Sequence, residues 1–553
     1  MKYGRTIKRL KRTTGAFVLM ILFLCDNLAG QNGSYNYFYR VYFKDKGANN
    51  PDDFLPESLL SQRALERRAK SDITVPDHRD LPVYSGYVNQ IAALGYTLHS
   101  TSKWMNTALF KTGTTADLNQ LTELPFVKDV RIVKSPAAKS SYEDKLDFPT
   151  SDEEDPPFDR PIAMVNGYPL HDSGFDGKGI LIAVLDGGFL NADRIPSLDN
   201  LHIRKGIKKT YDFVRNNEFV YSYHNHGTAV LSVLAGEIDG MIHGTARGAD
   251  YMLFRTEDVT SEFPVEEDFW VSGAEYADSC GADIISSSLG YFNFDDPSFD
   301  YKFSDMDGNS AFVTRAADIA ASKGILVVNS AGNERNKEWK RIIAPSDGDS
   351  VVAVGAVDGN NIISVFSSAG PSADGGVKPD NTTMGVSVTV QTNPASLARS
   401  NGTSFSCPVL SGMAACLMQA VTKATNIEVI DALHYSSDRY QSPDSLYGFG
   451  IPDMTKALKK LQDMRVSTPD EICIAGPNPT HGNLEITFRQ EPGHLVTELF
   501  SLTGVKIFRR EYKEYAGRVL RLTELNNREQ GMYFLRLITE HGTRVIKVIK
   551  TDR

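Results

Sequence analysis

Apolar runs of strand length in the middle of the chain constrain its fold most. Helical stretches separate these runs, which cover residues 180–185, 251–254, 283–286 and 325–329. An apolar run without alternation indicates a strand that is buried on both faces. Strands of this kind, joined by helices, form a parallel sheet that is sandwiched between helical layers. The sequence therefore predicts an α/β domain over residues 161–465.

A helix that is apolar or small on nearly all sides is expected after Ser404, in the centre of this domain. Pro408 would lie in its first turn, where proline is tolerated. Cys407 and Cys416 would stand roughly 13 Å apart along the helix axis, too far to form a disulfide. With Cys280 and Cys473 as the other cysteines beyond residue 30, no disulfide framework is predicted.

Two smaller units flank the α/β domain. The first, residues 31–139, is predicted as a small α/β unit with strands at 38–43, 107–110 and 127–133, one helix at 56–70 and another from Thr115. The second, residues 471–553, alternates with period two, which predicts an antiparallel β-sandwich. Its expected strands are 484–488, 496–500, 519–522, 533–537 and 545–549, with Thr503 and Gly504 in a turn.

The ends of the first unit carry processing signals. Basic residues between Lys2 and Arg12 precede an apolar run at 16–24, the pattern of a signal peptide spanning residues 1–30. That run is shorter than the ~20 residues that a membrane helix needs. Residues 140–160 form an acidic linker with prolines, whose composition stays solvated and open to proteolysis. A plain spacer explains the same composition.

Length limits the number of folded units, and net charge limits the kinds of partner. A chain of 553 residues is expected to hold about three or four folded units. The formal net charge of −10, with no clustered basic surface in the central region, argues against a nucleic-acid partner. The charge of a substrate stays open.

Three glycine-flanked motifs supply the groups that acyl transfer to water requires. Asp186 closes an apolar strand, where its carboxylate would orient the Nδ1 proton of His226. His226 would take the hydroxyl proton of Ser404 and return it to the leaving amine. Ser404 enters the buried helix, so its hydroxyl and amide would approach a substrate carbonyl. Asn333, after the strand at 325–329, would donate to the oxyanion together with the Ser404 backbone N–H.

Each motif alone has a simpler explanation. An aspartate after a strand, a Gly-Thr-Ser run and an asparagine after glycine are all common in turns. His224 and His226 also have the spacing of metal ligands on a strand, although no matching cysteine or carboxylate pair accompanies them. The combination of an Asp, His, Ser order with placement at strand ends favours the hydrolytic interpretation.

The region from about residue 160 to about residue 460 resembles the subtilisin-like serine proteases. The motifs that carry the resemblance lie at 182–189, 226–231, 286–290, 330–334, 378–380 and 402–408. It implies Asp186, His226 and Ser404 as the catalytic triad and Asn333 as the oxyanion donor. It also implies two backbone walls that pair with an extended substrate, formed by Ser288, Leu289 and Gly290 and by Ser330, Ala331 and Gly332.

The chain departs from the family pattern at three places. Gly187 stands where the family usually has Ser or Thr, Ala229 replaces a common second histidine, and Ser406 and Cys407 replace a usual small pair. None of these removes a reacting group, but Cys407 would make the site sensitive to mercurials. By its place before the catalytic region, the first unit resembles the ferredoxin-like inhibitory propeptide of these proteases.

The C-terminal region resembles the sorting domain of the type IX secretion system in Bacteroidetes. The resemblance rests on residues 476–484, Gly504 and residues 531–533. It implies the type IX machinery as a partner and the cell surface or medium as the destination. A β-sandwich that binds carbohydrate or protein is the alternative interpretation of this region.

Together these features predict a secreted serine endopeptidase that acts through an acyl-enzyme and is made as a precursor inhibited by its own propeptide. Its partner would be a peptide or protein substrate, and the chemistry requires no cofactor. A structural calcium ion is allowed, because Asp305, Asp307 and Asn309 alternate as oxygen ligands without completing a binding loop. A catalytically silent surface binding protein on the same scaffold is the alternative. An α/β-hydrolase esterase fits less well, since Ser406 occupies the last glycine of the required Gly-x-Ser-x-Gly elbow.

Overall fold

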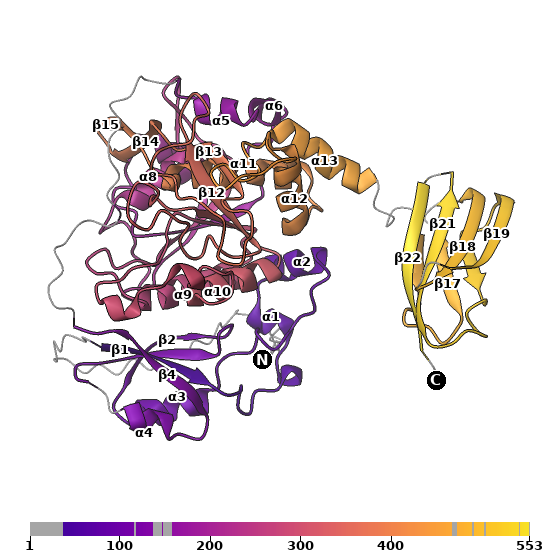
Figure 1. Ribbon diagram of the computed structural model, residues 1–553, viewed down its shortest axis with the longest axis horizontal. Coiled ribbons are helices and arrows are strands. Elements are labelled where there is room, and N and C mark those ends of the chain that lie inside the picture. The colour runs from indigo at the N-terminus through magenta and orange to yellow at the C-terminus, as the bar shows by residue number, and fades with distance from the viewer. Residues whose placement is uncertain are drawn as a thin grey trace, which may run out of the picture. The chain divides into compact units, whose positions relative to one another are not determined.

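The computed structural model describes residues 37–115, 118–136, 146, 157–466, 473–488, 491–502, 505–540 and 542–551. The expected signal peptide and the expected turn at Thr503 and Gly504 lie outside these residues. Most of the expected linker also lies outside them, since only Leu146 and the residues from Pro157 on are described. The chain divides into two compact units, Met1–Ala457 and Leu458–Arg553, which are described separately (Figure 1).

The larger unit is built on a seven-stranded parallel sheet with the strand order β13-β12-β11-β10-β5-β9-β6. Its strands are β5 (Leu181–Asp186), β6 (Ile207–Asp212), β9 (Asp250–Arg255), β10 (Ile284–Ser287), β11 (Leu326–Ser330), β12 (Val351–Val357) and β13 (Asn381–Met384). The predicted fold class is confirmed, and the four apolar runs form β5, β9, β10 and β11. Strands β6, β12 and β13 are additional to the predicted ones.

Helices cover both faces of this sheet (Figure 1). On β5, Leu181, Ala183 and Leu185 pack into the apolar cluster shared with α9 (Val265–Cys280) and α10 (Phe312–Ser322). Alternate residues of a strand point to opposite faces, so Ile182 and Val184 face the other layer. There α8 (His226–Ala235) and the buried α11 (Thr403–Ala420) pack against each other and against the strands.

Shorter elements complete the larger unit. The further helices are α5 (Arg160–Met164), α6 (Tyr168–Asp172), α7 (Asp199–Ile203) and α12 (Asn426–Ser436), and α13 (Met454–Val466) begins in this unit and continues past its boundary at Ala457. Two small hairpins pair β7 (Glu237–Ile238) with β8 (Ile242–His243) and β14 (Val388–Asn393) with β15 (Ser396–Ser400).

The N-terminal part of the larger unit forms an antiparallel sheet of order β2-β3-β1-β4. It comprises β1 (Tyr37–Phe43), α3 (Ser85–Ala92), β2 (Thr97–Ser102), β3 (Thr107–Thr112), α4 (Leu118–Thr122) and β4 (Val127–Lys134), a ferredoxin-like arrangement. One face packs on α3 and α4. The other face contributes Trp104, Leu109 and Val133 to the cluster around α9 and α10 (Figure 1).

The single helix expected at residues 56–70 was wrong, because the chain breaks there into α1 (Pro56–Leu59) and α2 (Gln62–Lys70). Leu60 is buried in an extended conformation, and Ser61 begins α2 by accepting a hydrogen bond from the Ala64 backbone N–H with its hydroxyl. A serine in this conformation is a strong helix start, and this capping overrides the continuous helical propensity.

The smaller unit is an antiparallel β-sandwich around an apolar core. One sheet has the order β16-β17-β20 and the other β19-β18-β21-β22. The strands are β16 (Cys473–Gly476), β17 (Leu484–Phe488), β18 (Gly493–Ser501), β19 (Lys506–Tyr515), β20 (Val519–Leu522), β21 (Gly531–Thr539) and β22 (Gly542–Lys550). All five expected strands are present, and β16 and β19 are additional. The residues of β19 are mostly exposed and charged, so it lacks the pattern of a half-buried strand.

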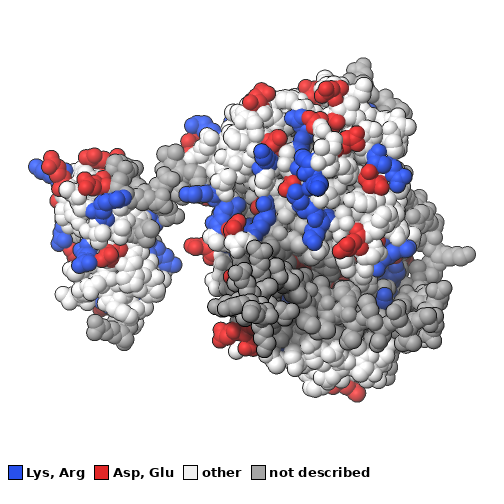
Figure 2. All heavy atoms as spheres, turned by 180° about the vertical axis from the view of Figure 1, so that it is seen from behind, with Lys and Arg blue, Asp and Glu red and all other residues white. Residues whose placement is uncertain are grey.

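Charges of both signs lie on one face of the described residues. Figure 2 shows acidic and basic side chains interspersed on the face seen from behind, so neither sign covers it. Among the described residues, none of the helices is long and apolar enough to cross a membrane.

A buried histidine makes the packing of the N-terminal sheet sensitive to pH. The Nε2–H of His99 on β2 donates to the Phe213 carbonyl oxygen at 2.9 Å, its ring packs against Phe38 and Phe269, and Nδ1 has no partner among the described residues. Burial, reinforced by the positive charge of Lys111, lowers the pKa of His99 to about 4. The folded state therefore binds this proton less readily than the unfolded state.

We expect folding stability to fall between pH 6.5 and pH 4 by roughly 3 kcal/mol through His99, because the unfolded chain takes up its proton first. His99→Gln keeps a donor for Phe213 but cannot titrate, so the melting temperature of this variant should depend less on pH over that range. His78→Gln, at an exposed position, is the matched control. Equal pH profiles for the native chain and His99→Gln in thermal denaturation would contradict the assignment.

Candidate active site

Asp186 and His226 meet where β5 ends and α8 begins. His226 Nδ1 lies 2.9 and 3.0 Å from the two carboxylate oxygens of Asp186, which also accepts the Gly187 backbone N–H at 2.7 Å. Both side chains are buried. A carboxylate only accepts hydrogen bonds, so Nδ1 carries the ring proton and Nε2 is left as an acceptor. This is the tautomer that a general base needs.

Two glycines allow this approach. The Gly227 backbone N–H donates to the Gly188 carbonyl oxygen at 3.1 Å, which holds the start of α8 against the chain after β5. A β-carbon on Gly227 would lie 2.5 Å from that same oxygen. Gly188 has a φ of +148° and lies between backbone atoms of Ser222 and His224, so it has no room for a side chain either. His224 accepts the His226 backbone N–H with Nδ1.

Ser404 lies in the first turn of α11, next to the residue through which this helix approaches the histidine. The ring of the next residue, Phe405, is centred 6.2 Å from the ring of His226. At the start of a helix the backbone N–H groups lack intrahelical acceptors, so the Ser404 amide is available to a substrate oxygen. The predicted helix after Ser404 is confirmed, and α8 and α11 pack directly against each other.

The expected place of Pro408 was wrong: it is the sixth residue of α11 and lies in the second turn. Proline has no backbone N–H, so the Ser404 carbonyl loses its normal helical donor. The Ser288 hydroxyl replaces that donor and bonds to the Ser404 carbonyl oxygen at 2.9 Å. This contact links the loop after β10 to the residue that carries the candidate nucleophile. From the sequence, Ser288 was expected to contribute only its backbone, as part of a substrate wall.

Asn333 is held by the start of the same helix. Its Oδ1 accepts the backbone N–H and the hydroxyl of Thr403, both at 2.9 Å. Two donors at one atom identify it as the amide oxygen, which leaves the NH₂ group to donate elsewhere. Thr403 orients Asn333. In the sequence, only the place of Thr403 within the Gly-Thr-Ser motif pointed to this role.

The two predicted substrate walls follow β10 and β11. Ser330 and Ala331 are bonded into the sheet, since Ser346 donates to the Ser330 carbonyl oxygen at 2.6 Å and the Ala331 N–H donates to Val354 at 3.0 Å. Asn329 bridges the walls by donating to the carbonyl oxygens of Leu289 and Ser330, each at 2.9 Å. The walls are thereby fixed at the same sheet edge as Asp186.

Gly290 and Gly332 keep the walls narrow. A β-carbon on Gly290 or Gly332 would lie within 3.0 Å of the Ile343 side chain. Gly332 also has a φ of +103°. Any larger residue would displace Ile343 or the loop itself, so these glycines are required for the shape of the walls.

The departures from the family pattern have physical reasons. A β-carbon on Gly187 would collide with Leu146, the one described residue in the middle of the acidic linker. Ala229 is fully buried in a cluster with Phe405 and Val409, which leaves no room for a histidine. Cys407 lies inside the domain with its thiol against the Ser287 and Val328 carbonyl oxygens.

The other sequence candidates serve as structural anchors. Asp307 forms a turn by accepting the backbone N–H groups of Asn309 and Ser310, and Asp305 accepts that of Lys302, so both carboxylates hold local turns. Lys378 donates to the Asp380 carboxylate at 2.7 Å and to two backbone carbonyls, so it braces β12 and β13. None of the four cysteines of the described residues takes part in a disulfide bond.

Comparison with known proteins adds independent information to this geometry. Residues 177–450 match the model of the subtilase family, peptidase S8. Residues 177–450 therefore form a peptidase S8 domain of the subtilase family. It is a serine endopeptidase. Residues 38–147 match the peptidase S8 propeptide domain of Bacteroidota, and residues 476–551 match the secretion system C-terminal sorting domain.

Curated relatives match about half of this chain. Subtilisin E of Bacillus subtilis (strain 168) is 28% identical over 301 residues, which are 54% of this chain and 70% of that protein. Subtilisin of Bacillus pumilus is 27% identical over 300 residues, 54% of this chain and 97% of that protein. Subtilisin Savinase of Lederbergia lenta is 28% identical over 299 residues, 54% of this chain and 97% of that protein.

The buried thiol of Cys407 should be unreactive in this subtilase, contrary to the sensitivity expected from its place near Ser404. Burial raises its pKa to about 11, and the reactive thiolate is then scarce at neutral pH. With iodoacetamide at pH 8, followed by peptide mass mapping, we expect half-buried Cys280 to be alkylated first and Cys407 only after unfolding in guanidinium. Alkylation of Cys407 in the folded chain at the denatured rate would contradict this.

Proposed function

We propose that Asp186, His226 and Ser404 form the catalytic triad of this endopeptidase. The Asp186–His226 contact carries the proposal, because a carboxylate can only accept, so it keeps the ring proton on Nδ1 and makes Nε2 the ring nitrogen that can take a hydroxyl proton. Ser404 directly precedes Phe405, whose ring is centred 6.2 Å from that of His226, and this supports Ser404 as the nucleophile. A nucleophile, a base and an orienting acid are then available on adjacent elements.

In the proposed reaction, the Ser404 hydroxyl attacks the scissile carbonyl while His226 accepts its proton. The tetrahedral oxyanion receives hydrogen bonds from the Ser404 backbone N–H and the Asn333 NH₂ group. His226 then protonates the leaving amine, and an acyl-enzyme remains on Ser404 until water, activated by the same histidine, releases it. The substrate would lie extended between the Ser288–Gly290 and Ser330–Gly332 walls. No step requires a cofactor.

We further propose that the N-terminal domain and linker inhibit the precursor directly. The domain is placed at residues 31–139, the linker at 140–160, the catalytic domain at 161–465 and the sorting domain at 471–553. Support comes from Leu146, whose side chain lies against Gly187, next to the triad aspartate. A linker residue at this position would occupy space that a substrate must enter.

Removing the proposed nucleophile and oxyanion donor should have separable effects. Ser404→Ala should lower peptide hydrolysis by about 10⁶-fold and stop self-processing, the magnitude that loss of the nucleophile has in subtilisin. Asn333→Ala should lower kcat by about 10²–10³-fold with little change in KM, because its bond forms only in the transition state. Asn360→Ala, in an exposed loop, is the control. Residual hydrolysis by purified Ser404→Ala near the native rate would refute the triad.

The sorting domain indicates type IX secretion to the cell surface or beyond. Deletion of residues 471–553 should therefore leave the protein in the periplasm, as judged by fractionation and immunoblotting. Full-length Ser404→Ala should be exported normally, which separates sorting from proteolytic activity. Normal export of the truncated chain would show that sorting does not depend on this domain.

A further inference from the structure

Helix α2 lies against the catalytic domain and outside the core of the N-terminal sheet (Figure 1). None of its described residues belongs to the apolar cluster that the sheet shares with α3 and α4. Instead it rests on two glycines of the catalytic domain. A β-carbon on Gly281 would lie 2.8 Å from the Ala64 nitrogen, and one on Gly324 would lie 3.5 Å from Arg67 Cγ. The fit of α2 therefore depends on the catalytic domain.

The surface under α2 is formed by the ends of two helices. Helix α9 ends at Cys280 and is capped by Gly281 with a φ of +92°, and α10 ends at Ser322, just before Gly324 with a φ of +85°. The last carbonyl groups of a helix lack intrahelical donors and carry the negative end of the helix dipole. A cation with several N–H groups is the complementary ligand for such a surface.

Three arginines of α2 supply these N–H groups: Arg63 and Arg67, four positions apart, lie on the same side of the helix, and Arg68 follows about 100° around it. Arg63 donates to the Gly179 and Gly281 carbonyl oxygens at 2.7 and 2.9 Å, and Arg67 donates to those of Ala282 and Lys323 at 2.5 and 3.1 Å. Arg63 also pairs with the Asp283 carboxylate.

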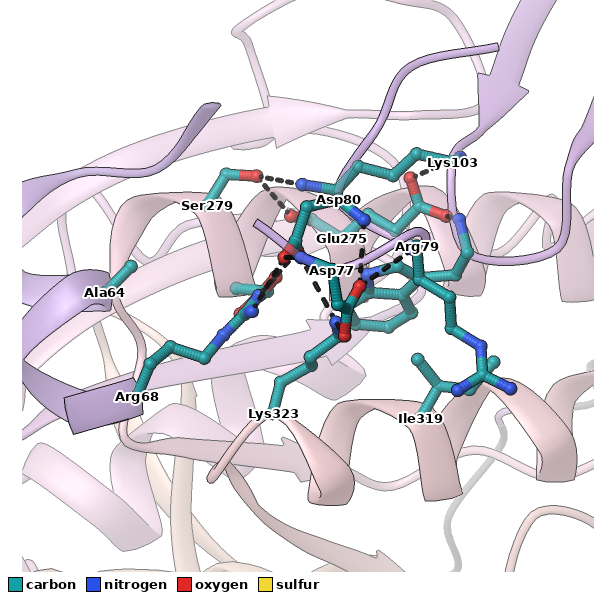
Figure 3. A network of polar contacts seen from close by, with 12 residues as sticks. Ala64, Arg68, Asp77, Arg79, Asp80, Lys103, Glu275, Ser279, Ile319 and Lys323 are labelled. Carbon is teal, nitrogen blue, oxygen red and sulfur yellow. Dashed lines mark hydrogen bonds and ion pairs between the residues drawn. The ribbon is translucent and has the colours of Figure 1, made fainter. Parts of the chain in front are cut away.

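The centre of the contact is a buried charge network (Figure 3). The Asp278 carboxylate of α9 accepts from Arg67 and from Arg68, the latter at 2.7 Å, while Arg68 also bonds both oxygens of Asp80. Arg68, Asp80 and Asp278 are each 0% exposed. Lys323 of the catalytic domain completes the network by pairing with Asp77. Removing one partner would leave an uncompensated buried charge.

This contact lies on the opposite edge of the sheet from the active site. Helices α9 and α10 lead into the first residues of β10 and β11, whereas Asp186 is the last residue of β5. In a parallel sheet these are the amino and carboxyl edges, separated by roughly 15–20 Å for strands of this length. A substrate in the active site would therefore not compete with α2.

We propose that the ends of α9 and α10 form a docking site for an arginine-bearing helix, and that α2 uses it to hold the N-terminal domain on the enzyme after the linker has been cut. The role of α2 in the precursor rests on the proposed function, whereas its anchoring on the catalytic domain does not.

The test uses full-length Ser404→Ala with a recognition sequence for an added site-specific protease inserted between residues 147 and 156. After cutting, the dissociation rate of the N-terminal fragment is measured by fluorescence of a dye on that fragment and by size-exclusion chromatography. We expect Arg67→Gln with Arg68→Gln to accelerate dissociation about 10²-fold or more, because Asp278 loses both partners. Arg79→Gln, at an exposed arginine of the same segment, should leave the rate unchanged.

If the double variant does not fold, Arg63→Gln, whose side chain is 39% exposed, tests the same site with an expected acceleration of about tenfold. Dissociation within twofold of the parent for the folded arginine variants would overturn the proposal. Failure of both variants to fold while Arg79→Gln folds would also overturn it, since the arginines would then act in folding and not in release. Because Ser404→Ala is cut by an added protease, failure of the proposed catalytic mechanism would not affect these outcomes.

Discussion

The close contact between the end of β5 and the start of α8 is the constraint around which the rest of the catalytic domain is arranged. A carboxylate can reach His226 Nδ1 only if the two backbones touch, and they do so through the Gly227 N–H and the Gly188 carbonyl. Once this pair is fixed, the other groups must come from elements that end at the same sheet edge. The parallel topology meets this requirement, because β10, β11 and the chain before α11 all deliver residues there.

Much of this arrangement could be predicted because it is local. Buried strands show as apolar runs, and the placement of Asp186 and Ser404 at element ends follows from those runs. The parts that could not be predicted depend on distant partners. No local pattern reveals that Ser288 supplies the donor that Pro408 denies to Ser404, or that Thr403 orients Asn333. Strand β13, with the polar sequence Asn-Thr-Thr-Met, is a strand only because β12 lies beside it.

The N-terminal domain meets the enzyme through an unusual share of buried charge. In addition to the α2 contact, Arg40 on β1 pairs with Asp268 at 2.6 Å and lies over the ring of Phe312. Glu275 accepts the Ser102 hydroxyl and the backbone N–H groups of Lys103 and Trp104. Desolvation offsets much of the attraction in such pairs, so they contribute more to the choice of partner and register than to net affinity. The apolar cluster around Trp104 supplies the remaining attraction.

The glycines around the site also affect how catalytic residues can be identified by mutagenesis. Gly188, Gly227 and Gly290 take no part in bond making, yet each faces backbone or a packed side chain where a β-carbon would stand. A saturation-mutagenesis map of activity should therefore mark these positions as no more tolerant than Asp186 or Ser404. In this domain, a position can be intolerant to substitution because a β-carbon has no room there, as well as because its side chain takes part in the reaction. Only a separate measurement of folding for each variant would distinguish the two.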